Sequence, residues 1–175
     1  MSQTTFKIVL VGKFGVGKTS IIHQYIHEEF VNDPPAIESQ TRDNVRNKMT
    51  FNVELIDSMG IEKDDPNNTF YFQKCHGCAL VFDKNDEDSY TFITEMIDKV
   101  KLLGPYDMKM ILIGNKSDLE SKVNDSIIQQ FATDNQMRYF SITAREKAHV
   151  IEALEYLVDL IHKRYFTKKK TCCIM

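Results

Sequence analysis

The stretch GKFGVGKT, residues 12–19, fits the phosphate-binding loop pattern G-x-x-x-x-G-K-[ST]. Its glycines allow backbone turns that a Cβ would forbid, so successive N–H groups can point inward at phosphate oxygens. In this pattern Lys18 reaches the β- and γ-phosphates, and the Thr19 hydroxyl binds Mg²⁺. A nearly continuous apolar run precedes the loop at residues 6–11, and helix-spaced apolar residues follow it. A chance glycine-rich turn is the alternative, and the order strand, loop, helix argues against it.

Strand and helix patterns alternate along the rest of the chain. Apolar or alternating runs predict further strands at residues 41–45, 49–56, 80–82, 110–114 and 139–141. Helical spacing predicts helices at residues 69–74, from a cap at Asp88 or Ser89 to Gly104, at 125–135 and at 150–161. The sequence therefore predicts an α/β fold of the P-loop NTPase class. We expect a six-stranded, mostly parallel sheet with one antiparallel edge strand, helices on both faces, and ligands at the carboxyl ends of the strands.

Length and charge narrow the class of protein. A chain of 175 residues suits one domain. No apolar run reaches transmembrane length, and the first residues are too polar for a signal peptide, so synthesis and retention in the cytosol are expected. The net charge of −3 hides a basic end, because no acid follows Asp159 while these residues do: Lys163, Arg164, Lys168, Lys169 and Lys170. The acidic remainder argues against nucleic-acid binding, while the basic end is either solvated or faces anionic lipid.

Cys75 and Cys78 form a lone C-x-x-C motif. A redox or zinc site is one interpretation, although no second pair of ligands is evident. Cys78 also opens an apolar run, residues 78–82, and small buried cysteines are common in protein cores. A structural role is therefore favoured for this pair.

Three short motifs follow further predicted strands. Residues 57–60, Asp-Ser-Met-Gly, place a carboxylate where it can hold Mg²⁺ through water and a glycine N–H where a terminal phosphate would lie. This motif occurs often by chance, and its weight comes from its place after the phosphate-binding loop. Residues 115–118, Asn-Lys-Ser-Asp, are more specific, because Asp118 can accept both N1–H and N2–H of guanine, a pair that adenine lacks. Residues 143–145, Thr-Ala-Arg, follow the last strand, where a backbone N–H can support the guanine O6.

In the order and spacing of these motifs, the chain resembles the Ras superfamily of small GTPases from Phe6 to Met175. The Ras-like branch looks nearest. No long insertion follows Asp118, unlike the Rho branch, and Ile56 stands where Rab proteins usually carry Trp. The resemblance implies a small GTPase domain over residues 1–166. It also implies GTP or GDP and Mg²⁺ as cofactors and a monomeric switch in signalling or membrane traffic.

The same resemblance assigns roles to individual residues. It implies catalytic roles for Lys18 and Gly60 and a metal site at Thr19 and Asp57. Phe30 would pack edge-on against the base and Lys116 along its face. The implied nucleotide contacts are Gly15, Val16, Gly17, Lys18, Thr19, Ser20, Phe30, Gly60, Asn115, Lys116, Asp118, Thr143, Ala144 and Arg145. Effector proteins would bind through residues 31–41 and 58–74, and an exchange factor would reload the nucleotide.

Three positions depart from the family pattern. Residues 35–38, Pro-Ala-Ile-Glu, align with the family's Pro-Thr-Ile-Glu after a one-residue deletion, so Ala36 keeps the backbone N–H but loses the hydroxyl that binds Mg²⁺. Ile61 replaces the Gln that orients the attacking water. Phe14 stands where relatives carry a small residue, and its ring should crowd the space for an incoming arginine finger. Because phosphoryl transfer depends on positioning and electrostatics, these changes predict weak hydrolysis with binding preserved.

Residues 167–175 form a basic tail that ends in Cys-Cys-Ile-Met. This C-a-a-X pattern ending in Met predicts farnesylation of Cys172, with the adjacent lysines supplying the second signal that a single lipid needs. The alternatives are geranylgeranylation of both Cys172 and Cys173, as in some Rab tails, and an unmodified end. Farnesylation predicts a place on the cytoplasmic face of the plasma membrane or an endomembrane.

Two other functions remain open at this level. One is a GTP-loaded interaction module that is tethered to a membrane and does not hydrolyse its nucleotide. The other is a P-loop ATPase or kinase of another class. A measurement of GTP turnover would distinguish the first of these functions from a switch. A measurement of nucleotide specificity would distinguish the second from a GTP-binding protein.

Overall fold

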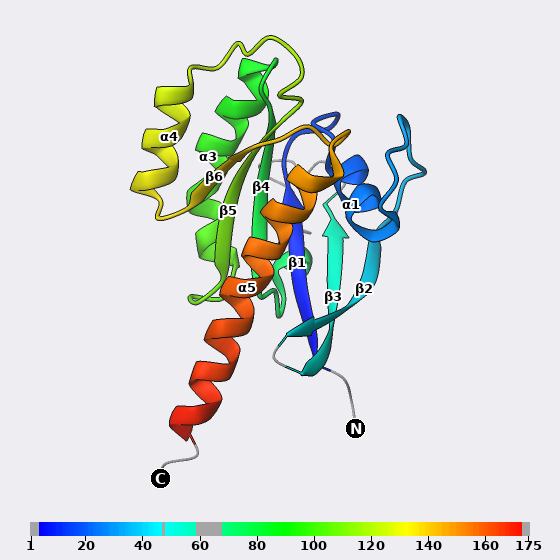
Figure 1. Cartoon of the computed structure of the whole chain (residues 1–175). Coiled ribbons are helices and arrows are strands. Elements are labelled where there is room, and N and C mark those ends of the chain that lie inside the picture. Colours follow the sequence, from blue (N-terminus) through cyan, green and yellow to red (C-terminus); the bar gives the residue numbers. More distant parts are fainter. Residues whose placement is uncertain (1–3, 47, 59–67, 173–175) are drawn as a thin grey trace.

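A six-stranded sheet forms the centre of the molecule (Figure 1). The computed structural model describes residues 4–46, 48–58 and 68–172, with side chains up to Phe166. The strands are β1 (Thr5–Val11), β2 (Ser39–Arg46), β3 (Met49–Asp57), β4 (Gly77–Asp83), β5 (Lys109–Asn115) and β6 (Arg138–Ser141). Their order is β2-β3-β1-β4-β5-β6; only the edge strand β2 is antiparallel to its neighbour. The predicted fold class is confirmed.

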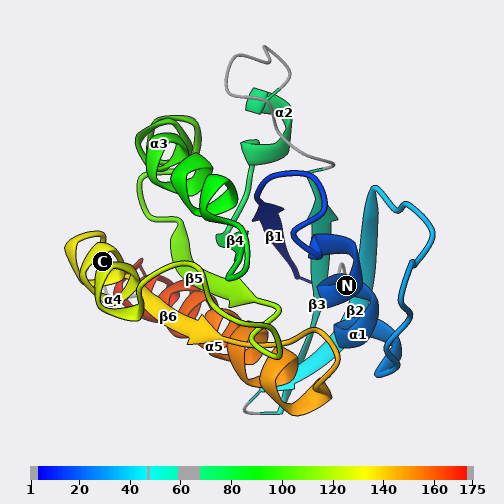
Figure 2. The same cartoon turned by 90° about the horizontal axis from the view of Figure 1, so that it is seen from above.

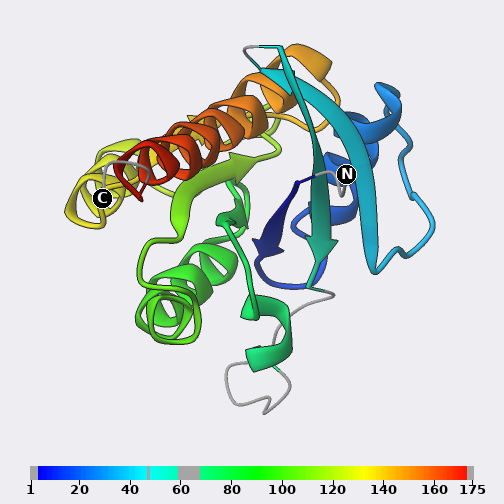
Figure 3. The same cartoon turned by 90° about the horizontal axis from the view of Figure 1, so that it is seen from below.

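Helices cover both faces of this sheet. They are α1 (Lys18–His27), α2 (Asn68–Phe72), α3 (Glu87–Leu103), α4 (Asp125–Asp134) and α5 (Lys147–Cys172). Seen along the sheet from above and from below, α1 and α5 lie on one side, while α2, α3 and α4 lie on the other (Figure 2, Figure 3). The two layers explain why the central strands read as continuous apolar runs, since both of their faces are buried.

The strand β1 contributes side chains to the hydrophobic cores on both faces of the sheet. Ile8 and Leu10 are buried against α1 and α5, whereas Val9 and Val11 are buried against α3. This alternation follows from the two-residue period of a strand. Because every β1 side chain from Phe6 to Val11 except Lys7 is buried, the loop that follows is held on a rigid base.

The start of α3 corrects one expectation. The N-cap is Asp86, whose side chain accepts a hydrogen bond from the Asp88 N–H at 3.1 Å, and not Asp88 or Ser89. The Ser89 hydroxyl instead donates to the Asp86 carbonyl at 2.7 Å, inside the first turn. Asp86 has the extended backbone that a cap requires, and the two acids after it favour the helix N-terminus.

An aromatic cluster holds residues 162–166 of α5 against the sheet. It comprises Phe6, Phe51, His76, His162, Tyr165 and Phe166. Ring centroids lie 5.4 Å apart for Phe6 and Tyr165 and 4.5 Å apart for His162 and Phe166. Burial lowers the pKa of both His76 and His162, so the cluster favours neutral imidazoles.

This cluster predicts a loss of stability in mild acid. The two folded-state histidine pKa values lie below the ordinary value of 6.5, so the unfolded chain binds more protons as the pH falls from about 7 to 5. The free energy of unfolding, measured by urea denaturation, should therefore fall over that range. His162→Phe should reduce the fall, because the new ring keeps the stack on Phe51 and Phe166 without titrating. An unchanged pH profile in that variant would contradict the role of His162.

Candidate nucleotide-binding site

The loop between β1 and α1 wraps around the Lys18 side chain. The Lys18 ammonium donates to the carbonyls of Gly12 at 2.9 Å and Lys13 at 3.1 Å, and the residue is only 5% exposed. Burial lowers the pKa of Lys18, while the charge of Asp57 acts in the opposite direction. Two of the three N–H donors of the ammonium therefore bond to the loop itself. The third has no acceptor among the described residues and is available to an anion.

Two positions of the loop require glycine because neighbouring atoms leave no room for a Cβ. Gly17 precedes α1 with φ +94°, and a Cβ there would collide with the Asn115 side-chain nitrogen. A Cβ at Gly12 would collide with the carbonyl of Val81 in β4. Larger residues at either position would push the loop away from the sheet, so the glycines of the sequence pattern have a packing role as well as a conformational one.

Asn115 and Lys116 join the loop to the neighbouring strand ends. The Asn115 amide donates to the Val16 carbonyl at 2.9 Å and accepts from the Ala144 N–H at 3.0 Å. Lys116, with φ +59°, donates to the Gly15 carbonyl at 3.0 Å and pairs with Asp83 at 2.7 Å. These two residues therefore connect three segments that are distant in the sequence.

Asp118 lies at the far end of this arrangement. Its carboxylate pairs with the Arg145 guanidinium at 3.5 Å, and that guanidinium lies 5.0 Å from the centre of the Phe30 ring. A hydrogen bond from Thr143, and then the charges of Arg145 and Lys116, hold the pKa of Asp118 below its usual value. The carboxylate is therefore ionised at neutral pH and offers acceptors only.

Thr19 and Asp57 meet at the other end. The Thr19 hydroxyl donates to the Asp57 carboxylate at 2.5 Å, and Asp57 is 3% exposed. Hydroxyl and carboxylate oxygens are the hard ligands that Mg²⁺ prefers, and the cation usually keeps waters and phosphate oxygens as further ligands. The pair therefore fits a site of that kind.

Two hollows lie between these groups and form one cleft. The first, about 630 Å³, contains Lys18, Thr19, Asp57 and residues 32–37 in its lining, with Phe14 at its edge. The second, about 310 Å³, contains Phe30, Asn115, Lys116, Asp118 and residues 143–145. Both share Gly15, Gly17, Ser20 and Asn32 as walls. The structure thus gathers the predicted residues along a single cleft at the carboxyl ends of the strands.

Some predicted residues differ in how they reach the cleft, or lie beyond the described part. The Val16 side chain is buried in the core, so only its backbone faces the loop. Gly60 and Ile61 fall outside the described residues. Sequence reasoning missed Asp83, which holds Lys116 in place; its position at the end of a buried strand beside Asn115 was the available signal. It also missed Leu119, a wall of the smaller hollow.

The C-x-x-C pair takes no part in this cleft. Cys75 and Cys78 are both buried, and burial raises the pKa of Cys75 to about 11 and that of Cys78 well above its ordinary value. Among the residues whose side chains the structure describes, which end at Phe166, no three His, Cys, Asp or Glu residues are grouped to hold a metal ion. The burial of both cysteines fits the structural role that the sequence favours.

Comparison with known proteins supports the same conclusion. Residues 7–163 match the Ras family. The chain belongs to the Ras family. It is 32% identical over 164 residues to human Ras-related protein R-Ras, covering 91% of this chain and 75% of the relative. It is 29% identical over 174 residues to mouse Ras-related protein Rab-7b, covering 93% and 85%. Rat GTP-binding protein Rab-3D is 29% identical over 164 residues, with 89% and 74% covered.

Family membership sets the general role. A Ras-family protein is a small GTPase, a GTP-binding switch of signalling or membrane traffic. Relatives of both the R-Ras and the Rab type match at similar identity, so nearness to the Ras-like branch stays a prediction. In the described part of the chain, no helix combines the length and apolar character needed to cross a bilayer.

Proposed function

We propose that this Ras-family protein binds GTP and GDP with Mg²⁺ in the cleft, hydrolyses GTP slowly, and acts as a membrane-tethered switch. The observation that carries the proposal is the cleft itself, with the buried Lys18 ammonium at one end and the ionised Asp118 carboxylate at the other. A cation placed for phosphates and an acceptor placed for guanine, in one continuous cleft, match the two ends of a guanine nucleotide.

The phosphate end would use the loop and the start of α1. Gly15 and residues 17–20 line the cleft and would supply backbone N–H groups, and the first turn of α1 would add the positive end of its dipole. Lys18 would turn its remaining donor to the β- and γ-phosphates. Because Lys18 is held by the Gly12 and Lys13 carbonyls, little side-chain freedom is lost when an anion binds.

The base end would use Asp118 and its neighbours. Asp118 would accept N1–H and N2–H of guanine, replacing its contact with Arg145. Phe30 and Lys116 line the same hollow, and a backbone N–H of residues 143–145 would support O6. Adenine would leave the carboxylate buried without donors, which is the source of the discrimination.

Thr19 and Asp57 would hold Mg²⁺, Asp57 through water. When bound, Mg²⁺ neutralises charge on the phosphate oxygens during transfer. Ala36 lies in the lining of the same hollow and brings no side-chain oxygen. Among the described residues that line this hollow, the proposed metal ligands are therefore Thr19 and Asp57, whose oxygens meet at 2.5 Å.

Slow hydrolysis follows from what the cleft lacks. Ala36 and Ile61 supply neither the metal-binding hydroxyl nor the amide that orients water, although the backbone role of Gly60 is retained in the sequence. Phe14 is 89% exposed at the mouth of the phosphate end, where a partner's arginine would enter. The same three residues favour the second candidate function, a GTP-loaded module that acts without turnover.

The nucleotide that stays bound after purification from cells tests the proposal. Slow hydrolysis predicts a large GTP fraction, and the switch function predicts that the fraction falls on incubation with Mg²⁺. A constant GTP fraction over the same incubation would favour the non-hydrolysing module. Bound ATP, or no guanine nucleotide at all, would contradict the proposed function.

The proposed tether depends on Cys172. Cys172→Ser should move the protein from the membrane to the soluble fraction, because farnesylation needs the thiol. Replacing Lys168, Lys169 and Lys170 by Gln should give a partial shift, since each basic residue near an anionic surface contributes about 1 kcal/mol. Cell fractionation measures both. Cys173→Ser is the matched control and should stay on membranes; release of both variants to the same extent would favour the doubly geranylgeranylated tail.

We also propose partners from the position of the cleft. Residues 32–37 line its phosphate end. Effectors would bind through residues 31–41 and 58–74, and an exchange factor would reload the nucleotide. The protein would act as a monomer on the cytoplasmic face of the plasma membrane or an endomembrane.

A further inference from the structure

α5 leaves the body of the protein at the end opposite the nucleotide cleft. It runs from Lys147 to Cys172, and Figure 1 shows it extending past the sheet, at the end where β1, β4 and β5 begin. Its 26 residues correspond to about 39 Å at the rise of an α-helix. The residue that we propose to carry the lipid is therefore the last residue of a helix that is packed against the domain.

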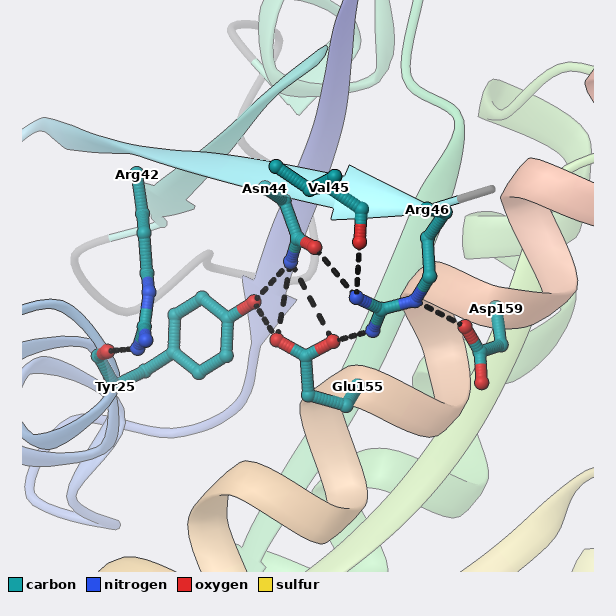
Figure 4. A network of polar contacts seen from close by, with 7 residues as sticks. All are labelled: Tyr25, Arg42, Asn44, Val45, Arg46, Glu155 and Asp159. Carbon is teal, nitrogen blue, oxygen red and sulfur yellow. Dashed lines mark hydrogen bonds and ion pairs between the residues drawn. The ribbon is translucent and has the colours of Figure 1, made fainter. Parts of the chain in front are cut away.

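One side of α5 is tied to α1 and β2 (Figure 4). The Glu155 carboxylate accepts hydrogen bonds from the Tyr25 hydroxyl at 2.6 Å and the Asn44 amide at 3.1 Å, and it also pairs with Arg46. Arg46 in turn donates through Nε to Asp159 at 2.8 Å, one turn further along the helix. Burial and the Glu155 contact raise the pKa of the Tyr25 hydroxyl far above its usual value, so it remains a donor.

The other sides of α5 are fixed as well. Arg164 donates through Nε and a terminal nitrogen to one Asp107 oxygen, at 3.0 and 2.8 Å, which ties the helix to the α3–β5 connection. Underneath, Tyr165 packs on Phe6 and His162 on Phe51. Each exposed ion pair is weak by itself, but together the contacts on three sides hold the helix in a single orientation relative to the sheet.

Two connections beside this helix expose apolar side chains. The β2–β3 hairpin exposes Val45 and Met49. The last turn of α3 exposes Leu102, at 83%, and the connection after it exposes Tyr106 fully. Exposed lysines accompany both groups, Lys48 in the hairpin and Lys101 beside Leu102. Large apolar and tyrosine side chains interspersed with lysine suit the interface of an anionic bilayer. Two acids at this end, Asp107 and Asp159, are paired with arginines.

We propose that α5 is a rigid strut that orients the domain on an anionic phospholipid membrane. The hairpin with Val45 and Met49 and the segment with Leu102 and Tyr106 face the bilayer, and the nucleotide cleft faces away from it. The proposal rests on the lipidation of Cys172 proposed above. It adds a defined membrane-facing surface, so that the residues around the cleft stay accessible to partners from the solvent side.

Tryptophan fluorescence tests the orientation, because the chain contains no Trp. Tyr106→Trp places a single reporter on the membrane-facing end. Ile127→Trp places a matched reporter on α4, near its cleft-side end, where the native side chain is 58% exposed. On vesicles of phosphatidylserine and brominated phosphatidylcholine, the Tyr106→Trp protein should lose most of its emission, and the Ile127→Trp protein should keep it. Equal quenching of the two reporters would overturn the proposed orientation.

A flexible insertion tests the strut itself. Gly-Ser-Gly-Ser placed between Phe166 and Thr167 should preserve vesicle binding but remove the difference between the two reporters, because the domain can then tumble about its lipid. If the difference persists with the insertion, the rigid helix is not what orients the domain, and the strut is overturned.

A second way of attaching the protein to the vesicles tests the proposed strut independently of the proposed lipidation. In one arm the chain is farnesylated; in the other, Cys172 in a Cys173→Ser background is coupled to a maleimide-headgroup lipid in the same vesicles. Failure of the farnesylated chain to bind, with the reporter difference still present in the coupled chain, would overturn the proposed lipidation alone. Loss of the difference in the coupled chain would overturn the orientation.

Discussion

The triple variant Phe14→Gly, Ala36→Thr, Ile61→Gln is expected to hydrolyse bound GTP roughly 10²–10³ times faster than the natural protein. The Thr would return a metal-binding hydroxyl to the lining of the phosphate hollow, where Ala36 lies beside the Thr19–Asp57 pair. The Gln would orient the attacking water. Such groups act on the charge that develops in the transition state, so the rate constant should change much more than the affinity for GTP.

Single-turnover hydrolysis of pre-bound GTP measures the effect. Ile61→Gln alone should recover little, because the water also needs an ordered segment around position 36, and losses within one catalytic unit do not add. The triple variant should also gain more than the natural protein from an added arginine-finger activator, since Phe14, 89% exposed at the entrance, no longer obstructs it. Equal rates for the natural protein and the triple variant would show that no defect exists. Another group, with Glu62 the nearest polar residue in the sequence, would then have to position the water.

Asp118→Asn is expected to reverse the base preference of the cleft. The natural protein should prefer GTP to ATP by roughly 10⁴–10⁵, the range for a site that hydrogen-bonds its substrate and rejects an analogue lacking the donors. An amide offers one acceptor and one donor, which suits xanthine, whose C2 carbonyl replaces the guanine amino group. Asp118→Asn should therefore weaken GDP binding and strengthen the binding of xanthine nucleotides.

Competition against a fluorescent GDP analogue measures these affinities. Asp134→Asn, the same change at the exposed end of α4, is the matched control and should bind GDP like the natural protein. The assignment of Asp118 fails if the two variants behave alike. Comparable affinity of the natural protein for ATP and GTP would overturn the guanine specificity as a whole.

Much of the fold and of the cleft could be predicted from the sequence, because it depends on local properties of the chain. Apolar runs of strand length, helical spacing and glycine at turns are short-range patterns, and they correctly placed the strands, the loop between β1 and α1, and the end of β5 at Asn115. The capping residue of α3 was the local error, because several acids compete for that position and the backbone at Asp86 decides between them.

The tertiary structure alone decided which distant groups meet. Lys116 bonds to Gly15 across 101 positions and Arg46 to Asp159 across 113, and no local pattern encodes either contact. The pairing of β4 with β5 brings Asp83 to Lys116. The packing of α5 against α1 and β2 brings Glu155 to Tyr25 and Asn44, which no local pattern connects. The physical reason is that sheet pairing places strand ends together whatever their separation in the chain, and the polar groups gathered there pair because burying them unpaired would be costly.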